Sequence, residues 1–185
     1  MKDIKLSCSC WKIEGIAHSI SPNNGNRIVC HCTDCQNFAK FLGNKESILD
    51  DYNGTDIFQM PLSKIEITQG KEYVKCMRIT EKWLYRWYSS CCKTPIGNTM
   101  SAKMNFMWVI HNFMNIKNRD EILGWINAYS FLKEEFNDRK PTPVFKILPR
   151  MFYEIICWRF QKKDKISDFF NEKGEPISKP EVLNK

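Results

Sequence analysis

The sequence predicts a mainly β protein with a helical C-terminal extension, and thus an α+β chain overall. Three observations support this class. Short segments of alternating or continuous apolar residues fill the first hundred positions. Turn-forming Gly, Pro, Asn and Ser residues separate these segments at short intervals. Beyond residue 118 the apolar residues recur every three or four positions instead, which is typical of helices.

Eight segments are expected to form strands, because they are short, rich in β-branched or aromatic residues and bounded by turn formers. Within one of them Trp83, Tyr85 and Trp87 alternate, which predicts one face of a half-buried strand. The expected strands lie within residues 4–11, 12–20, 27–32, 56–60, 64–68, 73–79, 83–88 and 106–113.

The C-terminal part is expected to begin with a helix over residues 119–136, where acidic side chains near the start favour the positive end of the helix dipole. The apolar positions of this helix are Ile122, Ile126, Tyr129, Leu132 and Phe136.

After Pro141 and Pro143, a second helix is expected with Pro149 in its first turn. Its predicted apolar face consists of Met151, Phe152, Ile155 and Ile156. The charged end of the chain is expected to be a loosely held tail. Together these features predict a β domain over 1–118, a helical extension over 119–161 and a tail over 162–185.

The 185 residues are enough for one compact unit, and 43% hydrophobic residues exclude a disordered chain. The N-terminus lacks the apolar segment of a secretory signal, and no uncharged apolar stretch is long enough to span a bilayer. We therefore expect a cytoplasmic protein. In that reducing compartment nine cysteines indicate metal ligands or free thiols rather than disulfides.

The formal charge of +7 favours anionic partners in general. Because thiolates bound to metal would offset part of this charge, the basic balance alone does not predict a nucleic-acid partner.

The main chemical signal is the clustering of seven cysteines. Cys30, Cys32 and Cys35 fall within six positions, and the other clusters are Cys8–Cys10 and Cys91–Cys92. In a Cys-x-Cys pair on extended backbone both sulfurs point to the same side and can reach one ion. Thiolate-rich sites select zinc or iron–sulfur chemistry, and zinc is the commoner choice for an isolated tetrahedral site.

Seven ligands divide naturally into four and three. Four ligands close a structural zinc site, whereas three leave a position for water or substrate. One partition joins the pairs Cys8–Cys10 and Cys91–Cys92 in a closed site and leaves Cys30, Cys32 and Cys35 as an open one. The sequence thus predicts two zinc ions, one structural and one with catalytic potential.

Other interpretations of the triplet stay open at this stage. A distant His31, His111 or Cys76 would close the second site. A redox pair formed by Cys32 and Cys35 is a minor alternative, because Cys30 adds a third sulfur and no βαβ pattern surrounds them. His31 is expected on the opposite face of the segment, as a surface group or one that supports the ligands. Buried apolar thiols are expected at Cys76 and Cys157.

Three stretches carry a resemblance to a known family: CSC at 8–10, CHCTDCQ at 30–36 and RWYSSCCKTPIG at 86–97. Over roughly residues 4–112 their order and spacing resemble the glutathione-dependent formaldehyde-activating enzymes, which include centromere protein V-like members. The resemblance implies a small-stranded, β-tent-like zinc fold. It also implies a structural zinc on the first and third motifs and a catalytic zinc on the middle one.

The sequence departs from the family pattern at several positions. Trp11 stands where a glycine normally follows the first motif, and Lys93 replaces the glycine of the third. Aligning Thr94 and Pro95 places Cys92 on the second family cysteine of that motif and Ser89 on the first. Cys91 is then either a displaced ligand or a bystander.

The activity implied by the resemblance is that of a carbon–sulfur lyase, the reversible addition of glutathione or another thiol to formaldehyde or a related aldehyde. Cys30, Cys32 and Cys35 would hold the catalytic zinc. Candidate cations for the glutathione carboxylates are Arg27, Lys40, Arg78 and Arg86, whose alternative role is that of solvated charges at strand edges. The competing hypothesis is a non-catalytic, zinc-stabilised module that binds a protein or nucleic acid through its basic charge and aromatic segment.

Overall fold

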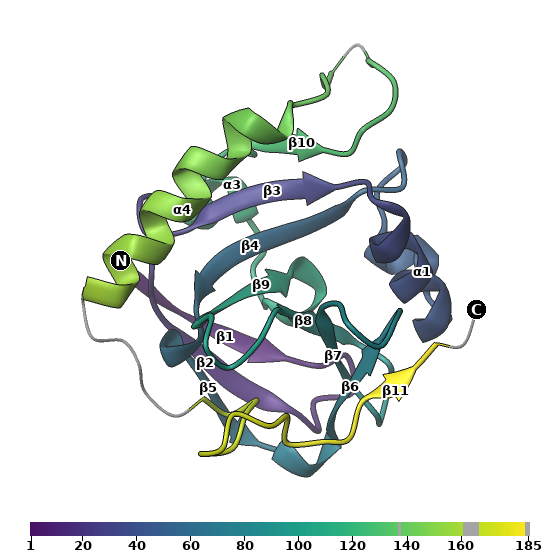
Figure 1. Cartoon of the computed structure of the whole chain (residues 1–185), viewed down its shortest axis with the longest axis vertical. Coiled ribbons are helices and arrows are strands. Elements are labelled where there is room, and N and C mark those ends of the chain that lie inside the picture. The colour runs from purple at the N-terminus through teal and green to yellow at the C-terminus, as the bar shows by residue number, and fades with distance from the viewer. Residues whose placement is uncertain (137, 161–166, 184–185) are drawn as a thin grey trace.

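Two β-sheets form the centre of the molecule, which a computed structural model describes over residues 1–136, 138–160 and 167–183 (Figure 1). The small sheet is antiparallel with the order β1-β2-β5, and the large sheet has the order β10-β3-β4-β9-β8-β7-β6-β11. These sheets confirm the predicted mainly β, α+β class.

Each of the eight segments expected to form strands overlaps one, whereas β8, β10 and β11 were not expected. The strands are β1 Lys2–Ser7, β2 Glu14–Ile20, β3 Asn26–Cys30, β4 Thr55–Pro61, β5 Ile65–Gln69, β6 Val74–Arg78, β7 Tyr85–Ser89, β8 Pro95–Thr99, β9 Phe106–Ile110, β10 Ala128–Ser130 and β11 Glu181–Val182. The helices are α1 Thr33–Leu42, α2 Lys45–Ile48, α3 Arg119–Leu123 and α4 Val144–Phe160, with short 3₁₀ segments at Leu62–Lys64, Lys71–Tyr73 and His111–Phe113.

The aromatic strand is shorter than predicted. Trp83 precedes β7 and is 64% exposed, so the alternating aromatic face is restricted to Tyr85 and Trp87. Trp87 is fully buried and Tyr85 packs beside it with ring centroids 6.2 Å apart.

The large sheet is buried on both faces, because successive residues of its strands contribute to different apolar clusters. In β4, Phe58 packs in one cluster with side chains of the small sheet such as Leu6. The preceding residue, Ile57, packs in the other cluster with Phe38 of α1 and Ile147 of α4. The small sheet therefore covers one face of the large sheet, and α1 and α4 cover the other.

The prediction of one helix over residues 119–136 is wrong. Helix α3 ends at Leu123, because Gly124 adopts a positive φ of 80° and packs against Pro22. Asn127 N then donates to Arg27 O, and the chain continues as β10, parallel to β3. The helical spacing of the apolar residues was thus produced by one short helix followed by an edge strand.

The second predicted helix exists, but its start and its buried face differ from the prediction. Helix α4 begins at Val144, so Pro149 lies inside it. Ile147 and Trp158 are buried, whereas Phe152 and Ile156, which were expected on the apolar face, are about half exposed. The face of the helix that packs on the protein consists of Ile147, half-buried Met151 and Trp158, which recur at helical spacing.

The prediction of a loosely held tail is also wrong for residues 167–183. Phe169 is fully buried against Trp87, with ring centroids 5.1 Å apart, and β11 pairs in parallel with β6 (Figure 1). The segment after residue 118 thus supplies both edge strands of the large sheet, β10 and β11. Both edge strands are very short, which limits the pairing of the sheet with other chains. The predicted boundaries at 118 and 161 stay predictions, and residues 161–166 and 184–185 lie outside the described residues.

Replacing Phe169 by alanine should lower the free energy of unfolding by about 3 kcal/mol, because it empties a fully buried aromatic site. Phe152→Ala is the matched control, since that side chain is 49% exposed. Chemical denaturation of both variants measures the difference. Equal stability of the two would show that the C-terminal segment does not contribute to the core.

Across the described residues, none of the helices combines the length and apolar character needed to cross a membrane.

Candidate metal centres

The first and third cysteine motifs meet in space. Cys8 and Cys10 follow β1, Cys91 and Cys92 follow β7, and their four sulfurs lie within 4.8 Å of one another. Cys10 Sγ is 3.6 Å from Cys8 Sγ and 3.3 Å from Cys91 Sγ, and Cys91 Sγ is 3.9 Å from Cys92 Sγ. A tetrahedral zinc with Zn–S bonds of about 2.3 Å needs sulfurs about 3.8 Å apart. The donor set and its spacing therefore fit a metal ion.

Two turns in left-handed conformation bring these sulfurs together. Trp11 has a φ of 62° and Lys93 a φ of 60°, at the two positions where the resembling family has glycine. Trp11 N donates to Cys8 O and Lys93 N donates to Ser89 O, which closes each turn. Non-glycine residues in this region cost about 1–2 kcal/mol each, so other interactions must compensate.

The hydroxyl groups of the neighbouring residues connect the two motifs. Ser9 N donates to Thr94 Oγ1 at 2.9 Å, and Cys92 Sγ lies 3.2 Å from the same hydroxyl. Although burial raises the pKa of Cys92, hydrogen bonds with Ser89, Ser9 and Thr94 lower that pKa to about 5. Burial and the contacts with Cys10 and Cys8 raise the pKa of Cys91 to about 12. Four close sulfurs cannot all ionise unless a cation joins them.

The triplet lies where β3 ends and α1 begins. Cys30 is the last residue of β3, Cys32 is the N-cap of α1, and Cys35 stands in the first helical turn. Backbone N–H groups of Cys35 and Gln36 donate to Cys32 O, which starts the helix. The three sulfurs lie within 4.8 Å of one another, close to a helix N-terminus that favours thiolates. The motif is thus a strand end and a helix start, and the strand ends at Cys30, two residues before the end of the predicted segment.

The pKa values of the triplet show how its three thiols compete for one negative charge. Contacts with the Cys30 and Cys35 sulfurs lower the pKa of Cys32 to about 2. Contacts with Cys32 raise the pKa of Cys30, and contacts with Cys30, together with complete burial, raise the pKa of Cys35. A divalent cation would let all three ionise, so the donor set fits a metal ion here as well. Both cysteine groups can hold a metal ion, and the identity of each metal stays a prediction.

Arg86 supplies a positive charge beside the triplet. Its side chain is 2% exposed, and its Nη1 donates to Cys35 Sγ at 3.9 Å and to Asn98 Oδ1 at 3.2 Å. Nη2 lies 3.8 Å from Asp34 Oδ2. Three thiolates around a divalent cation leave a net charge of −1, which a buried guanidinium offsets. Arg86 is therefore a buried partner of the triplet and not the solvated edge charge that was the alternative.

Replacing Arg86 by glutamine should weaken the binding of one zinc ion about 10- to 100-fold, because a supporting charge next to the sulfurs is lost. Competition with a chromophoric chelator measures this affinity. Arg78→Gln is the control, since the Arg78 guanidinium stacks on Tyr85 and bonds to loop carbonyls. Unchanged affinity in Arg86→Gln would contradict a role of Arg86 at the triplet.

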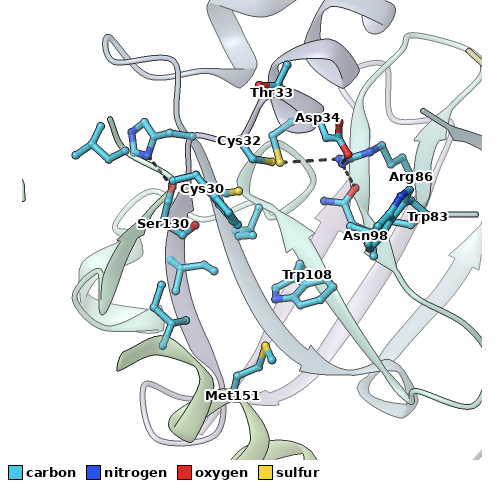
Figure 2. A pocket seen from close by; sticks show the side chains of 18 of the residues that line it. Cys30, Cys32, Thr33, Asp34, Trp83, Arg86, Asn98, Trp108, Ser130 and Met151 are labelled. Carbon is cyan, nitrogen blue, oxygen red and sulfur yellow. Dashed lines mark hydrogen bonds and ion pairs between the residues drawn. The ribbon is translucent and has the colours of Figure 1, made fainter. Parts of the chain in front are cut away.

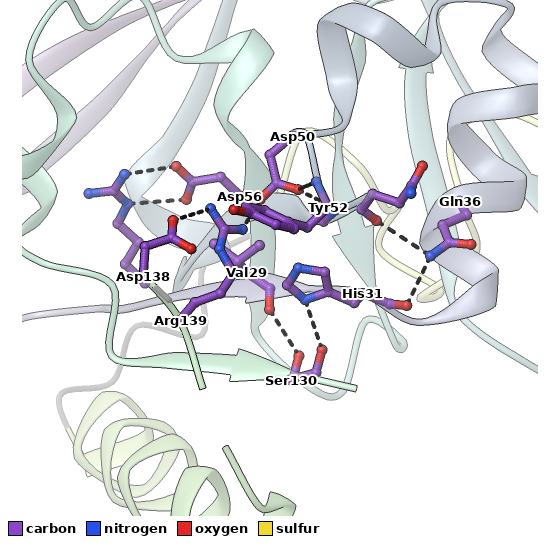
Figure 3. A network of polar contacts seen from close by, with 12 residues as sticks. Val29, His31, Gln36, Asp50, Tyr52, Asp56, Ser130, Asp138 and Arg139 are labelled. Carbon is purple, nitrogen blue, oxygen red and sulfur yellow. Dashed lines mark hydrogen bonds and ion pairs between the residues drawn. The ribbon is translucent and has the colours of Figure 1, made fainter. Parts of the chain in front are cut away.

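His31 points away from the sulfurs, as its position between two cysteines predicts. It is buried rather than on the surface, and its Nδ1 lies 3.4 Å from Ser130 O of β10 (Figure 3). Its Nε2 has no hydrogen-bond partner in the described structure, and a side chain at Gly54 would collide with it. Burial lowers the pKa of His31, so the ring is neutral at pH 7.

A polar network beside His31 connects the segment after β10 to the loop before β4. Arg139 donates to Asp50, and its guanidinium lies 4.1 Å from the Tyr52 ring and 5.0 Å from the Tyr129 ring (Figure 3). These contacts hold the segment after β10 against the loop between α2 and β4. They connect two parts of the chain for which no local sequence pattern predicts a contact.

The other residues suggested as a fourth ligand lie apart from the triplet. Cys76 Sγ donates to Ser178 O and is buried in the cluster shared with the small sheet, as predicted for an apolar thiol. His111 Nδ1 lies 3.3 Å from Asp56 O. Among the described residues, the group that can hold a metal here consists of three cysteines. Cys157 is half-buried on α4.

A cavity of about 770 Å³ adjoins the triplet (Figure 2). Figure 2 shows Cys30 and Cys32 at one end, Trp108 of β9 along the wall and Met151 of α4 at the far end. The triplet therefore faces a space large enough for a small-molecule ligand.

Two of the cations suggested for substrate carboxylates are occupied elsewhere. Arg27 is 3% exposed and forms ion pairs with Asp56 and Asp120 at 2.8 and 2.6 Å. Arg78 stacks on Tyr85. Lys40 is exposed on α1.

Sequence reasoning missed helix α1 and the cavity wall. The helix has a readable signal, because Cys35, Phe38, Ala39 and Leu42 are spaced as one helical face and are all buried. The wall residues Asn98 and Trp108 come from β8 and β9, and no local pattern connects them to the triplet.

Comparison with known proteins gives a family without an assigned activity. A family of unknown function, DUF6151, matches residues 1–165. A crystal structure of a Rhodobacter sphaeroides protein is similar with a TM-score of 0.47 at 14% sequence identity, covering 66% of this chain and 97% of that one. No curated protein matches significantly. The chain belongs to the DUF6151 family.

Proposed function

We propose that this protein is a zinc-dependent, carbon–sulfur lyase-like enzyme that adds a thiol reversibly to formaldehyde or a related aldehyde. The observation that carries the proposal is the position of the triplet. Its three sulfurs line a cavity of about 770 Å³, whereas the four sulfurs of Cys8, Cys10, Cys91 and Cys92 form a separate, complete donor set.

The reaction requires a sulfur to attack a carbonyl carbon. The C–S bond forms, the C=O π bond breaks, and the thiol proton ends on the oxygen, so that a thiol and an aldehyde give a hydroxyalkyl thioether. A zinc ion held by three thiolates would supply an open coordination position for a thiol sulfur or an aldehyde oxygen.

The chain's own residues would prepare this chemistry. Arg86 offsets the negative charge of the sulfurs from a position that is closed to solvent. Asp34 lines the same cavity, and its carboxylate can accept a proton. Ile147, Leu148 and Met151 of α4 add apolar wall to the cavity, with Met151 at the end away from the sulfurs (Figure 2).

The motif resemblance also supports the proposal. It assigns the closed site to the first and third motifs and the catalytic site to the middle one, and the same groups of sulfurs are close in space. The left-handed turns at Trp11 and Lys93 also occur where that family has glycine. A cytoplasmic location and a small thiol–aldehyde adduct as substrate belong to this proposal.

The test combines metal content with ligand exchange. Elemental analysis should give two zinc ions per chain. After cobalt substitution, 2-mercaptoethanol should shift the visible absorption of one ion only, because the other has four protein ligands. Incubation with formaldehyde and a thiol should then give the hydroxymethyl thioether faster than the uncatalysed reaction.

A single metal ion with a spectrum insensitive to thiols would contradict the proposal. It would favour the alternative of a zinc-stabilised binding module. One feature supports that alternative: the outer face of α4 exposes Phe145, Phe152, Tyr153 and Ile156, which a partner protein could cover.

A further inference from the structure

The cavity beside the triplet has a polar end and an apolar remainder. The polar end consists of the three cysteines with Asp34, Arg86 and Asn98. The rest of the wall is largely apolar, and its members include Ile28, Ile57, Trp108, Ile147, Leu148 and Met151. A ligand that reaches the sulfurs must therefore place its other end against hydrocarbon and aromatic surface (Figure 2).

The charges of the wall do not match glutathione. That tripeptide carries two carboxylates and one ammonium group. Of the described residues that line the cavity, Arg86 and Lys133 are the cations. Arg86 already contacts Cys35, Asn98 and Asp34, and Lys133 is exposed. Burying a carboxylate against Ile57, Trp108 or Met151 without a partner would be costly.

Helix α4 creates this apolar character. Its buried face points Ile147 toward the sheet that carries the triplet, and half-buried Leu148 and Met151 extend the same surface. The segment just after β10 adds Phe131 and Leu132 to the wall. The part of the chain beyond the cysteine motifs thus determines what the cavity accepts.

We propose that the substrate thiol or aldehyde carries an aryl or alkyl group, which lies between Trp108 and α4 while the reacting group faces the triplet. This inference rests on the proposed function for the reacting group. The apolar cavity itself, however, can be tested without any sulfur chemistry.

Two primary thiols that share the HS–CH2–CH2 unit test the inference on the zinc-loaded protein. 2-Phenylethanethiol carries a phenyl group on this unit, and 2-mercaptoethanol carries a hydroxyl group. Calorimetric titration should give at least about tenfold tighter binding of 2-phenylethanethiol, because the phenyl group leaves water. Glutathione should bind no better than 2-mercaptoethanol. Equal affinities of the two small thiols would overturn the inference and leave the proposed function intact.

A pair of adjacent substitutions on α4 locates the effect. Met151→Asp places a charge in the cavity wall and should reduce the preference for 2-phenylethanethiol at least about tenfold. Phe152→Asp, on the exposed side of the helix, should retain it. If Met151→Asp does not fold, the affinities of the two thiols for the unsubstituted protein still test the inference.

A ligand without sulfur separates the two proposals. 2-Phenylethanol should bind the cavity in both zinc-loaded and metal-free protein, and Met151→Asp should abolish this binding. If no thiol binds but 2-phenylethanol does, the proposed function fails and the apolar cavity stands. If neither 2-phenylethanethiol nor 2-phenylethanol binds, the inference is wrong.

Discussion

Cys10→Ser should lower the free energy of unfolding of the zinc-loaded protein by about 5 kcal/mol or more. Structural zinc sites contribute about 10–16 kcal/mol of apparent binding free energy, and loss of one of four thiolates removes a large part of it. Cys10 is exposed, so its replacement removes almost no packing. A large effect at such a position identifies a metal ligand rather than a core residue.

Denaturation in the presence and absence of a chelator measures this effect. The difference between Cys10→Ser and the unsubstituted protein should disappear once the metal is removed. Cys157→Ser is the matched control, because Cys157 is a half-buried cysteine on α4 outside both groups. Equal stability of Cys10→Ser and Cys157→Ser with zinc present would exclude a structural ion at this position.

Cys32→Ser should have the opposite profile, with thiol binding reduced at least about 100-fold and the fold retained. Serine is a favourable N-cap residue, and Cys32 makes no side-chain cap hydrogen bond, so the substitution preserves the start of α1. The loss of one of three ligands, in contrast, removes the open site. We expect the free energy of unfolding to change by less than about 2 kcal/mol.

Calorimetric titration with 2-mercaptoethanol and thermal melts of the same preparation measure both quantities. Cys30→Ser is a useful comparison, because Cys30 ends a buried strand and its loss adds a packing cost. If Cys32→Ser destabilises the protein as much as Cys10→Ser does, the two cysteine groups do not have separate roles.

The cysteine groups were predictable because each motif is local. Three sulfurs within six positions cannot lie far apart, and neither can those of Cys8 and Cys10, although this pair lies in a turn after β1 and not on the expected extended backbone. The role of Cys91 as a partner of Cys8 and Cys10, in contrast, could not be predicted. Cys91 was either a displaced ligand or a bystander in the sequence, and only the left-handed turn at Lys93 places its sulfur 3.8 Å from Cys8 Sγ.

The C-terminal part was not predictable from local pattern. β10 and β11 are edge strands of three and two residues, and their pairing partners lie about 100 positions earlier in the sequence. Such short strands have no periodicity of their own, because the partner strand determines their conformation. The same long-range pairing carries α4 across the sheet and so forms the cavity beside the triplet.

The central claim is an unsaturated three-thiolate metal site at the end of an apolar cavity. The most direct measurement is an anomalous-scattering map at the zinc edge from crystals of the zinc-loaded protein. It should show two peaks, one surrounded by Cys8, Cys10, Cys91 and Cys92, the other by Cys30, Cys32 and Cys35 with a non-protein fourth ligand facing Trp108. No second peak, or a fourth protein side chain bound to that ion, would contradict the account.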